Sequence, residues 1–185
     1  MQDIVDLSFK LDVRHKYHFS DRPISSVYSI DPSQQKIARK PEGLWYSWGG
    51  SWPLFLLTDY LCSFGQSDNA KWARTRMNEI NFVYKVNIDF KKIKRLQTCK
   101  SFKNFTLEFG NPVTDKEKEE EYVSDYMDFP HNIRWKKVAR HCHGIDVKFN
   151  QNCVFDYHWY EHWDCHSGCV WRLNAIKDLK LIWVA

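Results

Sequence analysis

A strand, a glycine turn and a helix are predicted by the stretch Gly43-Leu44-Trp45-Tyr46-Ser47-Trp48-Gly49-Gly50 and the residues that follow it. The first six residues suit a strand, and the glycine pair marks its end. From Trp52 to Phe64, apolar residues recur at the spacing of a buried helix. This unit gathers several tryptophan rings and the hydroxyl group of Ser47 near one strand end.

Two further segments, far away in the chain, complete a pattern with this unit. Upstream, Tyr17-His18-Phe19-Ser20 reads as a short strand that ends in a turn at Asp21-Arg22-Pro23. Downstream, Ser167-Gly168-Cys169-Val170-Trp171 reads as a late strand. We expect these three strands to form one site that binds a dinucleotide. The first would contribute a histidine, and the second would contribute aromatic rings and a hydroxyl group.

The remaining pattern predicts more strands than helices. The strands are expected at 7–11, 81–89, 145–149 and 179–184, and the helices at 114–128 and 132–142. Because the helices are short, the chain is predicted to have an α+β fold with a split, mostly antiparallel two-sheet core and short flanking helices. No repeat or linker divides it, so residues 1–185 are expected to form a single domain.

Composition restricts the class of protein. A chain of 185 residues is long enough for one core, and its nine tryptophans can fill that core or line a pocket for a flat ligand. No stretch approaches the roughly 18 apolar residues of a membrane span, and no signal peptide is evident. The six cysteines are scattered along the chain, which is typical of a protein whose thiols are reduced. We therefore expect the protein to be in the cytoplasm, which could be that of a host cell.

Positive charge is concentrated in one part of the chain. The net charge is only +4, but from Lys71 to Lys103 ten lysines and arginines stand against Glu79 and Asp89. This segment is either the solvated face of a helix and a strand or a surface that faces phosphate groups.

The order of these segments resembles the ADP-ribosyltransferase superfold, the group of diphtheria-toxin-like and poly(ADP-ribose)-polymerase-like domains. Tyr17-His18-Phe19-Ser20 is similar to its first strand, and Gly43 to Ser47 with the following helix is similar to its second unit. Residues 82–89, 143–147 and 167–176 resemble three later strands of the family. The motifs Pro-x-Gly-Leu-Trp and Trp-Asp-Cys-x-Ser-Gly are also similar to segments of small phage and large-virus proteins.

The resemblance implies that NAD is the substrate and that ADP-ribose is transferred to a protein or nucleic-acid acceptor. His18 would donate a hydrogen bond to a ribose hydroxyl, Trp45 or Tyr46 would stack on nicotinamide, and Ser47 would hold the carboxamide or the ribose. Arg22 and the pair Arg39-Lys40 could reach the pyrophosphate. The cofactor-binding residues are thus expected to be His18, Ser20, Arg22, Gly43, Trp45, Tyr46 and Ser47.

One departure from the family concerns catalysis. The family has a catalytic glutamate at the position of Ser167, and serine cannot supply its negative charge. Glu161 or Asp164, from the preceding loop, would then stand in, so the expected catalytic residues are Glu161, Asp164 and Ser167. The alternative is an inactive ligand-binding or host-interaction protein of the same fold.

A third hypothesis is a zinc-stabilised nucleic-acid-binding domain. It rests on the basic segment and on the histidines and cysteines that crowd the stretch from His141 to Cys169. No Cys-x-x-Cys pair occurs there, and the spacing fits a zinc site poorly. We therefore predict no metal ligands.

Overall fold

A computed structural model describes residues 2–62, 67–111, 132–150, 152–153, 156–161 and 163–185. These residues form helices and two β-sheets, so the predicted α+β fold with mainly antiparallel strands is confirmed. The helix expected at 114–128 lies outside the described residues. Within the described ranges, every helix is too short or too polar to traverse a lipid bilayer.

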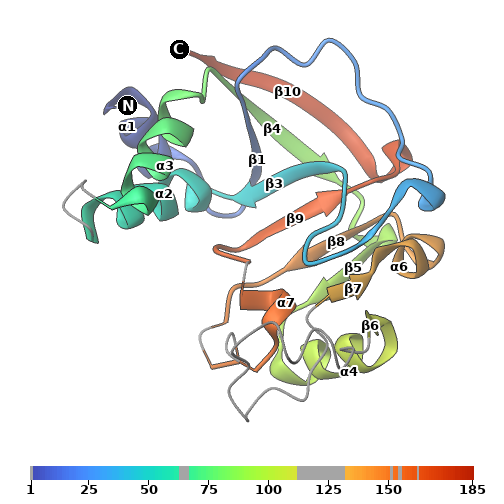
Figure 1. Cartoon of the computed structure of the whole chain (residues 1–185). Helices are drawn as coiled ribbons and strands as arrows, with labels where there is room; N and C mark the ends of the chain where they lie inside the picture. The colour runs from blue at the N-terminus through green and yellow to red at the C-terminus, as the bar shows by residue number, and fades with distance from the viewer. Residues whose placement is uncertain (1, 63–66, 112–131, 151, 154–155, 162) are drawn as a thin grey trace.

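The larger sheet has seven strands in the order β10-β4-β1-β3-β9-β8-β5, and the strands form an arc in Figure 1. Neighbouring strands are antiparallel except for β5 and β8, which are parallel. The bounds are β1 Lys16–Ser20, β3 Leu44–Trp48, β4 Phe82–Ile88, β5 Ile93–Leu96, β8 Gly144–Val147, β9 Ser167–Val170 and β10 Ile176–Val184. The smaller antiparallel sheet has the order β2-β7-β6, with bounds Ile37–Ala38, Asn132–Arg134 and Gly110–Asn111.

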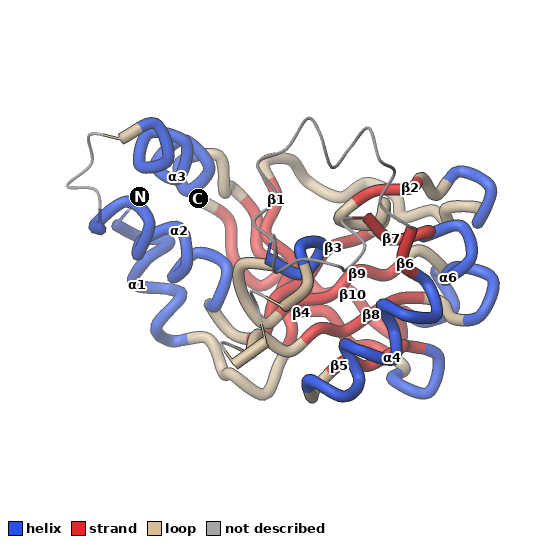
Figure 2. The backbone as a smooth tube through the Cα atoms, turned by 60° about the horizontal axis from the view of Figure 1, so that its bottom comes forward, coloured by secondary structure: helices blue, strands red, loops and turns tan. Residues whose placement is uncertain are grey.

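The helices form two groups at opposite ends of the larger sheet (Figures 1 and 2). The first group consists of α1 Gln2–Lys10, α2 Ser51–Cys62 and α3 Asp68–Asn78. The second consists of α4 Cys99–Phe109, α6 Trp135–His141 and the short α7 His158–Glu161. The second group encloses an aromatic core that includes Trp135, Trp159, Trp163 and Trp171, each at most 1% exposed.

The strand expected at 7–11 is wrong, because these residues belong to α1 and the turn after it. Ile4, Val5 and Ser8 are buried there, which is the spacing of a helix face rather than the alternation of a strand. The helix expected at 132–142 begins later, at Trp135, because Asn132–Arg134 pairs in the smaller sheet. Helices α3 and α4 were not predicted, since their exposed lysines and arginines obscured a narrow buried face.

Tight packing between strands depends on Gly168 in β9. A Cβ atom at this position would overlap the phenol ring of Tyr46 and the carbonyl oxygen of Ile145. Both neighbours are buried, so neither can move away without a rearrangement of the sheet.

We therefore expect Gly168→Ala to lower the free energy of unfolding by about 1–3 kcal/mol or more. Urea denaturation followed by circular dichroism would measure the change. Ser26→Thr, which adds one carbon atom in an exposed loop, is the control and should have almost no effect. Equal stability of Gly168→Ala and the parent protein would contradict the packing of Tyr46 against β9.

Candidate functional site

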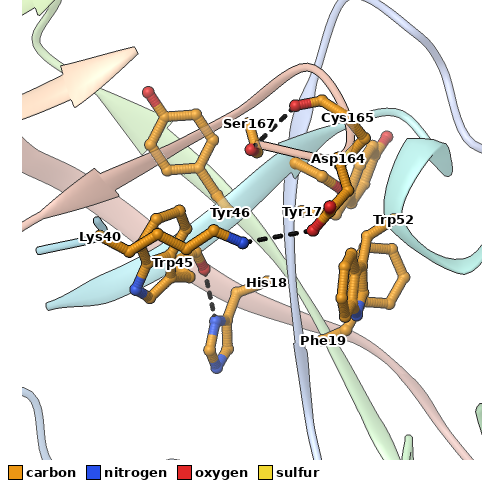
Figure 3. A pocket seen from close by; sticks show the side chains of 11 residues that line it. Tyr17, His18, Phe19, Lys40, Trp45, Tyr46, Trp52, Asp164, Cys165 and Ser167 are labelled. Carbon is orange, nitrogen blue, oxygen red and sulfur yellow. Dashed lines mark hydrogen bonds and ion pairs between the residues drawn. The ribbon is translucent and has the colours of Figure 1, made fainter. Parts of the chain in front are cut away.

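A cavity of about 290 Å³ opens where strands β1 and β3 separate. Strand β1 pairs with β4 along all five of its residues, from Lys16 to Ser20. Its pairing with β3 covers only Lys16 with Trp48 and Tyr17 with Ser47. Beyond Tyr17 the two strands are not paired, and the side chains around the resulting space line the cavity. The cavity is lined by Tyr17, His18, Phe19, Lys40, Trp45, Tyr46, Ser47, Trp52, Asp164, Cys165 and Ser167 (Figure 3).

His18 links the two strands just beyond their last paired residues. Its Nδ1 lies 2.6 Å from the carbonyl oxygen of Trp45, and a carbonyl oxygen can only accept a hydrogen bond. Nδ1 therefore carries the proton, and the Nε2 of the neutral ring is an acceptor. Burial lowers the pKa of His18, against the opposing effect of this hydrogen bond, so the neutral ring dominates at pH 7.

This geometry corrects the expected role of His18. We expected its neutral ring to donate a hydrogen bond to a ribose hydroxyl. Since the proton is committed to the carbonyl group of Trp45, the remaining nitrogen can only accept a bond from such a hydroxyl. His18 therefore lines the cavity with a ring nitrogen that is an acceptor and not a donor.

The two rings proposed for stacking, Trp45 and Tyr46, differ in how accessible they are. Tyr46 is only 2% exposed, and its hydroxyl group donates a 2.9 Å hydrogen bond to the buried carboxylate of Asp146. Trp45 is partly exposed at the cavity, where its ring packs on Trp163 and lies 5.6 Å from the Nζ of Lys40. Tyr46 contributes to the wall, but it cannot stack on a ligand.

Two serine residues that are partners in neighbouring strands line the cavity. Ser47 of β3 and Ser167 of β9 are partners in the antiparallel register. The Oγ of Ser167 donates a 3.0 Å hydrogen bond to the carbonyl oxygen of Cys165. The Oγ of Ser47 is buried and has no hydrogen-bond partner among the described residues. An unsatisfied buried hydroxyl beside a cavity is suited to bind a polar group of a ligand.

Asp164 is the only residue with a carboxylate among the described residues that line the cavity. Its Oδ2 lies 3.2 Å from the Nζ of Lys40, and the two side chains are 26% and 38% exposed. Figure 3 shows this pair between Trp45 on one side and Trp52 with Phe19 on the other. The cavity therefore combines aromatic walls with one anionic and one cationic group.

Three of the expected cofactor-binding residues do not line the cavity. Ser20 donates its hydroxyl hydrogen to the carbonyl oxygen of Arg22, so it stabilises the turn after β1. The side chain of Arg22 is 85% exposed and pairs with Asp21. Gly43 is needed for close approach, since a Cβ there would lie 2.6 Å from the Sγ of Cys169, and its φ of +156° suits glycine. These residues shape the strand ends and do not line the wall.

The backbone of Glu161 ends helix α7, and its side chain lies outside the described part of the structure. Asp164 is thus the expected catalytic residue whose carboxylate the structure places at the cavity. In the described part of the chain, no three His, Cys, Asp or Glu side chains converge as metal ligands.

Sequence reasoning did not assign Tyr17, Phe19 and Cys165 to the site. Tyr17 and Phe19 flank His18 in β1. Their position beside this histidine could have identified them as residues of the site. Cys165 follows Asp164 in the motif Trp-Asp-Cys-x-Ser-Gly, so its position between Asp164 and Ser167 was the signal that could have placed it at the site. Burial raises the pKa of its thiol to about 11, so this cysteine is not a reactive thiolate at pH 7.

The opposite face of β3 is anchored by Asp146 of β8. This carboxylate is fully buried, and its Oδ1 accepts hydrogen bonds from Tyr46 at 2.9 Å and from the indole nitrogen of Trp48 at 2.8 Å. Its Oδ2 lies 3.7 Å from His166 and 3.6 Å from Arg95. Burial alone would raise the pKa of Asp146, but the interactions with His166, Trp48 and Tyr46 keep it below the ordinary value of 3.8.

We expect Asp146→Asn to lower the free energy of unfolding by about 1–3 kcal/mol at neutral pH, because the buried charge and its hydrogen bonds are altered. A carboxylate with a lowered pKa contributes stability above its unfolded-state pKa and loses it as the pH falls through the folded-state pKa. The difference between the variant and the parent should therefore shrink below a pH of about 3.8. Urea denaturation at several pH values would measure it.

The control for this measurement is Asp178→Asn, which alters an exposed carboxylate in β10 of the same sheet. It should change stability little at any pH. If Asp146→Asn behaved in the same way, Asp146 would not anchor β3.

Comparison with known proteins gives no assignment for this chain. It matches no protein-family model, no curated protein and no solved structure.

Proposed function

We propose that the cavity binds the nicotinamide-ribose part of NAD and that the protein transfers ADP-ribose to a protein or nucleic-acid acceptor. The observation that carries the proposal is the meeting of His18, Trp45, Ser47 and Asp164 around one cavity at the separation of β1 and β3. These residues come from three distant segments. The family resemblance implied a site built from the same three segments.

The size and lining of the cavity suit one half of the dinucleotide. Ligand pockets usually measure roughly 300–1,000 Å³, and this one, at about 290 Å³, is too small for all of NAD. The flat nicotinamide ring would stack on Trp45, and its carboxamide would bond to the unsatisfied hydroxyl group of Ser47. The rest of NAD would lie outside, beyond Lys40.

His18 would orient the ribose. The Nε2 of its neutral ring accepts a hydrogen bond from a ribose hydroxyl, while Nδ1 stays bonded to Trp45. This bond ties the position of the sugar to the strand that carries the stacking ring. His18 is thus a binding group and takes no proton in the reaction.

Asp164 would stabilise the charge that develops when nicotinamide leaves. The bond between the ribose carbon and the ring nitrogen breaks, and nicotinamide departs with both electrons. The ribose becomes positively charged, which a nearby carboxylate stabilises. A nucleophilic atom of the acceptor then bonds to that carbon and releases its proton to water.

Lys40 has a part in this scheme through its ion pair with Asp164, at 3.2 Å. The pyrophosphate of NAD is more highly charged than one carboxylate, so it would compete for the ammonium group. Binding of the dinucleotide would then release Asp164 toward the sugar.

The second candidate function is binding of NAD or ADP-ribose without transfer. It is favoured by Ser167, which provides no charge where the family has glutamate, and by the ion pair that neutralises Asp164. Calorimetric titration with NAD, combined with chromatography for free nicotinamide, separates the two candidates. Binding with release supports transfer, and binding without release supports the second candidate. No binding at millimolar NAD would exclude transfer and NAD binding, and no binding of ADP-ribose in the same experiment would exclude the second candidate entirely.

His18→Ala and Asp164→Asn should affect different steps. Loss of one hydrogen bond to the sugar in His18→Ala should weaken NAD binding about five- to tenfold. Asp164→Asn should slow nicotinamide release roughly 10²–10³-fold, with a smaller change in affinity. Calorimetry and the release assay would measure the two effects.

Arg22→Gln is the matched control, because Arg22 follows the same strand but does not line the cavity. It should change neither the affinity nor the rate. An effect of Arg22→Gln equal to that of His18→Ala would place the ligand elsewhere, and thermal unfolding of each variant would show whether its fold is intact.

NAD binding should also depend on pH through His18. Its pKa lies below the ordinary value of 6.5, so the acceptor nitrogen is free at neutral pH and becomes protonated as the pH falls through the lowered pKa. Affinity should therefore fall as the solution is made acidic and the pH passes below 6.5 through the lowered pKa of His18. The same titration of His18→Ala should lack this step, and an identical step in both proteins would assign it to another group.

A further inference from the structure

A second cavity, of about 430 Å³, lies at the far end of β9. Its wall combines the 3₁₀ turn at Pro32, the end of helix α6, the residue before β8 and the turn after β9. The lining residues are Pro32, Ala139, Arg140, His141, His143, Arg172 and Asn174. None of them lines the first cavity, so this site is independent of the proposed NAD site.

The second cavity is basic. Two arginines and two histidines line it, and its described lining residues include no carboxylate. In the part of the chain that the structure describes, neither Arg140 nor Arg172 forms an ion pair or a side-chain hydrogen bond. The carboxylate of Asp31, next to Pro32, interacts with Arg172 electrostatically without forming an ion pair, so the positive charge around this space is only partly offset. A bound anion would offset the rest.

The position of these groups is not explained by helix α6 alone. Basic residues are common in the last turn of a helix, where Arg140 and His141 lie, because they complement its dipole. Arg172 and His143 belong to other segments and reach the same cavity. The helix dipole therefore accounts for Arg140 and His141 but not for the presence of Arg172 and His143 at the same cavity.

The backbone holds these segments together. The amides of Trp171 and Arg172 both donate to the carbonyl oxygen of His143, at 3.0 and 3.1 Å. Lys92 donates from Nζ to the carbonyl oxygen of Asn174 at 2.7 Å, which fixes the turn after β9. These hydrogen bonds fix the backbone segments that carry His143 and Arg172 relative to each other without a ligand.

His143 adds an unsatisfied polar atom. Its Nδ1 is buried and has no hydrogen-bond partner among the described residues. Buried nitrogen atoms are rarely left without a partner, and such exceptions call for an explanation such as a ligand or an ordered water. This observation is independent of the charge of the cavity.

We propose that this second cavity binds the phosphate group of a phosphorylated ligand. Arginine presents a planar fork of donors that matches phosphate oxygens, and two arginines can clamp one phosphate from two sides. A bare phosphate ion would leave much of about 430 Å³ empty, so the phosphate is expected to carry an organic group. That group belongs either to a small molecule or to the end of a nucleic acid.

Calorimetry on the full chain would test the proposal with three probes. They are inorganic phosphate, adenosine monophosphate with adenosine as its control, and a short single-stranded DNA with and without a 5′-phosphate. We expect saturable binding of one phosphate-bearing ligand per chain, with weaker or no binding of the matched ligand that lacks the phosphate. The tighter of the monophosphate and the phosphorylated DNA identifies the source of the phosphate.

The double variant Arg140→Gln/Arg172→Gln should weaken this binding by about tenfold or more, because two charge-assisted contacts are lost. The matched control is Arg74→Gln/Lys103→Gln, which removes the same charge from exposed positions on α3 and α4. It should retain the binding. Thermal unfolding without ligand would confirm that both variants are folded.

Three outcomes would overturn the proposal. They are an equal loss of affinity in both double variants, binding that does not depend on the phosphate group, and no saturable binding at millimolar probe. Each of them leaves the test of the first cavity unaffected, because that test is decided by His18→Ala and Asp164→Asn, which change residues that line only the first cavity.

Discussion

Strand β1 pairs fully with β4 but only briefly with β3, and the candidate site depends on this difference. A sheet that continued its ladder would leave no room between neighbouring strands, which lie about 4.8 Å apart. Here the ladder ends after Tyr17, and the ring of His18 bonds to the carbonyl group that a longer ladder would have used. The opening is therefore held at a defined width by a side chain that is itself part of the cavity wall.

Strand β3 serves two purposes because its side chains alternate between two faces. Tyr46 and Trp48 both bond to the buried Asp146, which fixes the strand in the sheet. Trp45 and Ser47 lie at the cavity on the other side. A strand anchored on one face can present a rigid ring and hydroxyl group on the other, which is the preorganisation that ligand binding favours.

Local patterns were sufficient for much of this structure. The glycine pair after Trp48 and the apolar run after Trp52 predicted β3 and α2, and the alternation around Tyr84 predicted β4. His18, Trp45, Tyr46, Ser47, Asp164 and Ser167 were named from the sequence, and they meet at one cavity. The residue pattern did not predict helix α1, because its apolar spacing over a few residues suited a strand as well as a helix. It did not predict α3 and α4, because exposed charged residues dominate their sequences.

The sequence by itself determined which segments are strands at the site and which polar residues they carry, since both depend on neighbours a few positions apart. Only the tertiary structure decided that the ring of Tyr46 points to Asp146 rather than to a ligand, that Arg22 faces solvent, and that Lys40 meets Asp164. It also decided which nitrogen of His18 carries the proton. These features depend on where one strand stops pairing with another and on contacts between residues far apart in the chain. Local residue patterns cannot predict them, because such patterns depend only on residues a few positions apart.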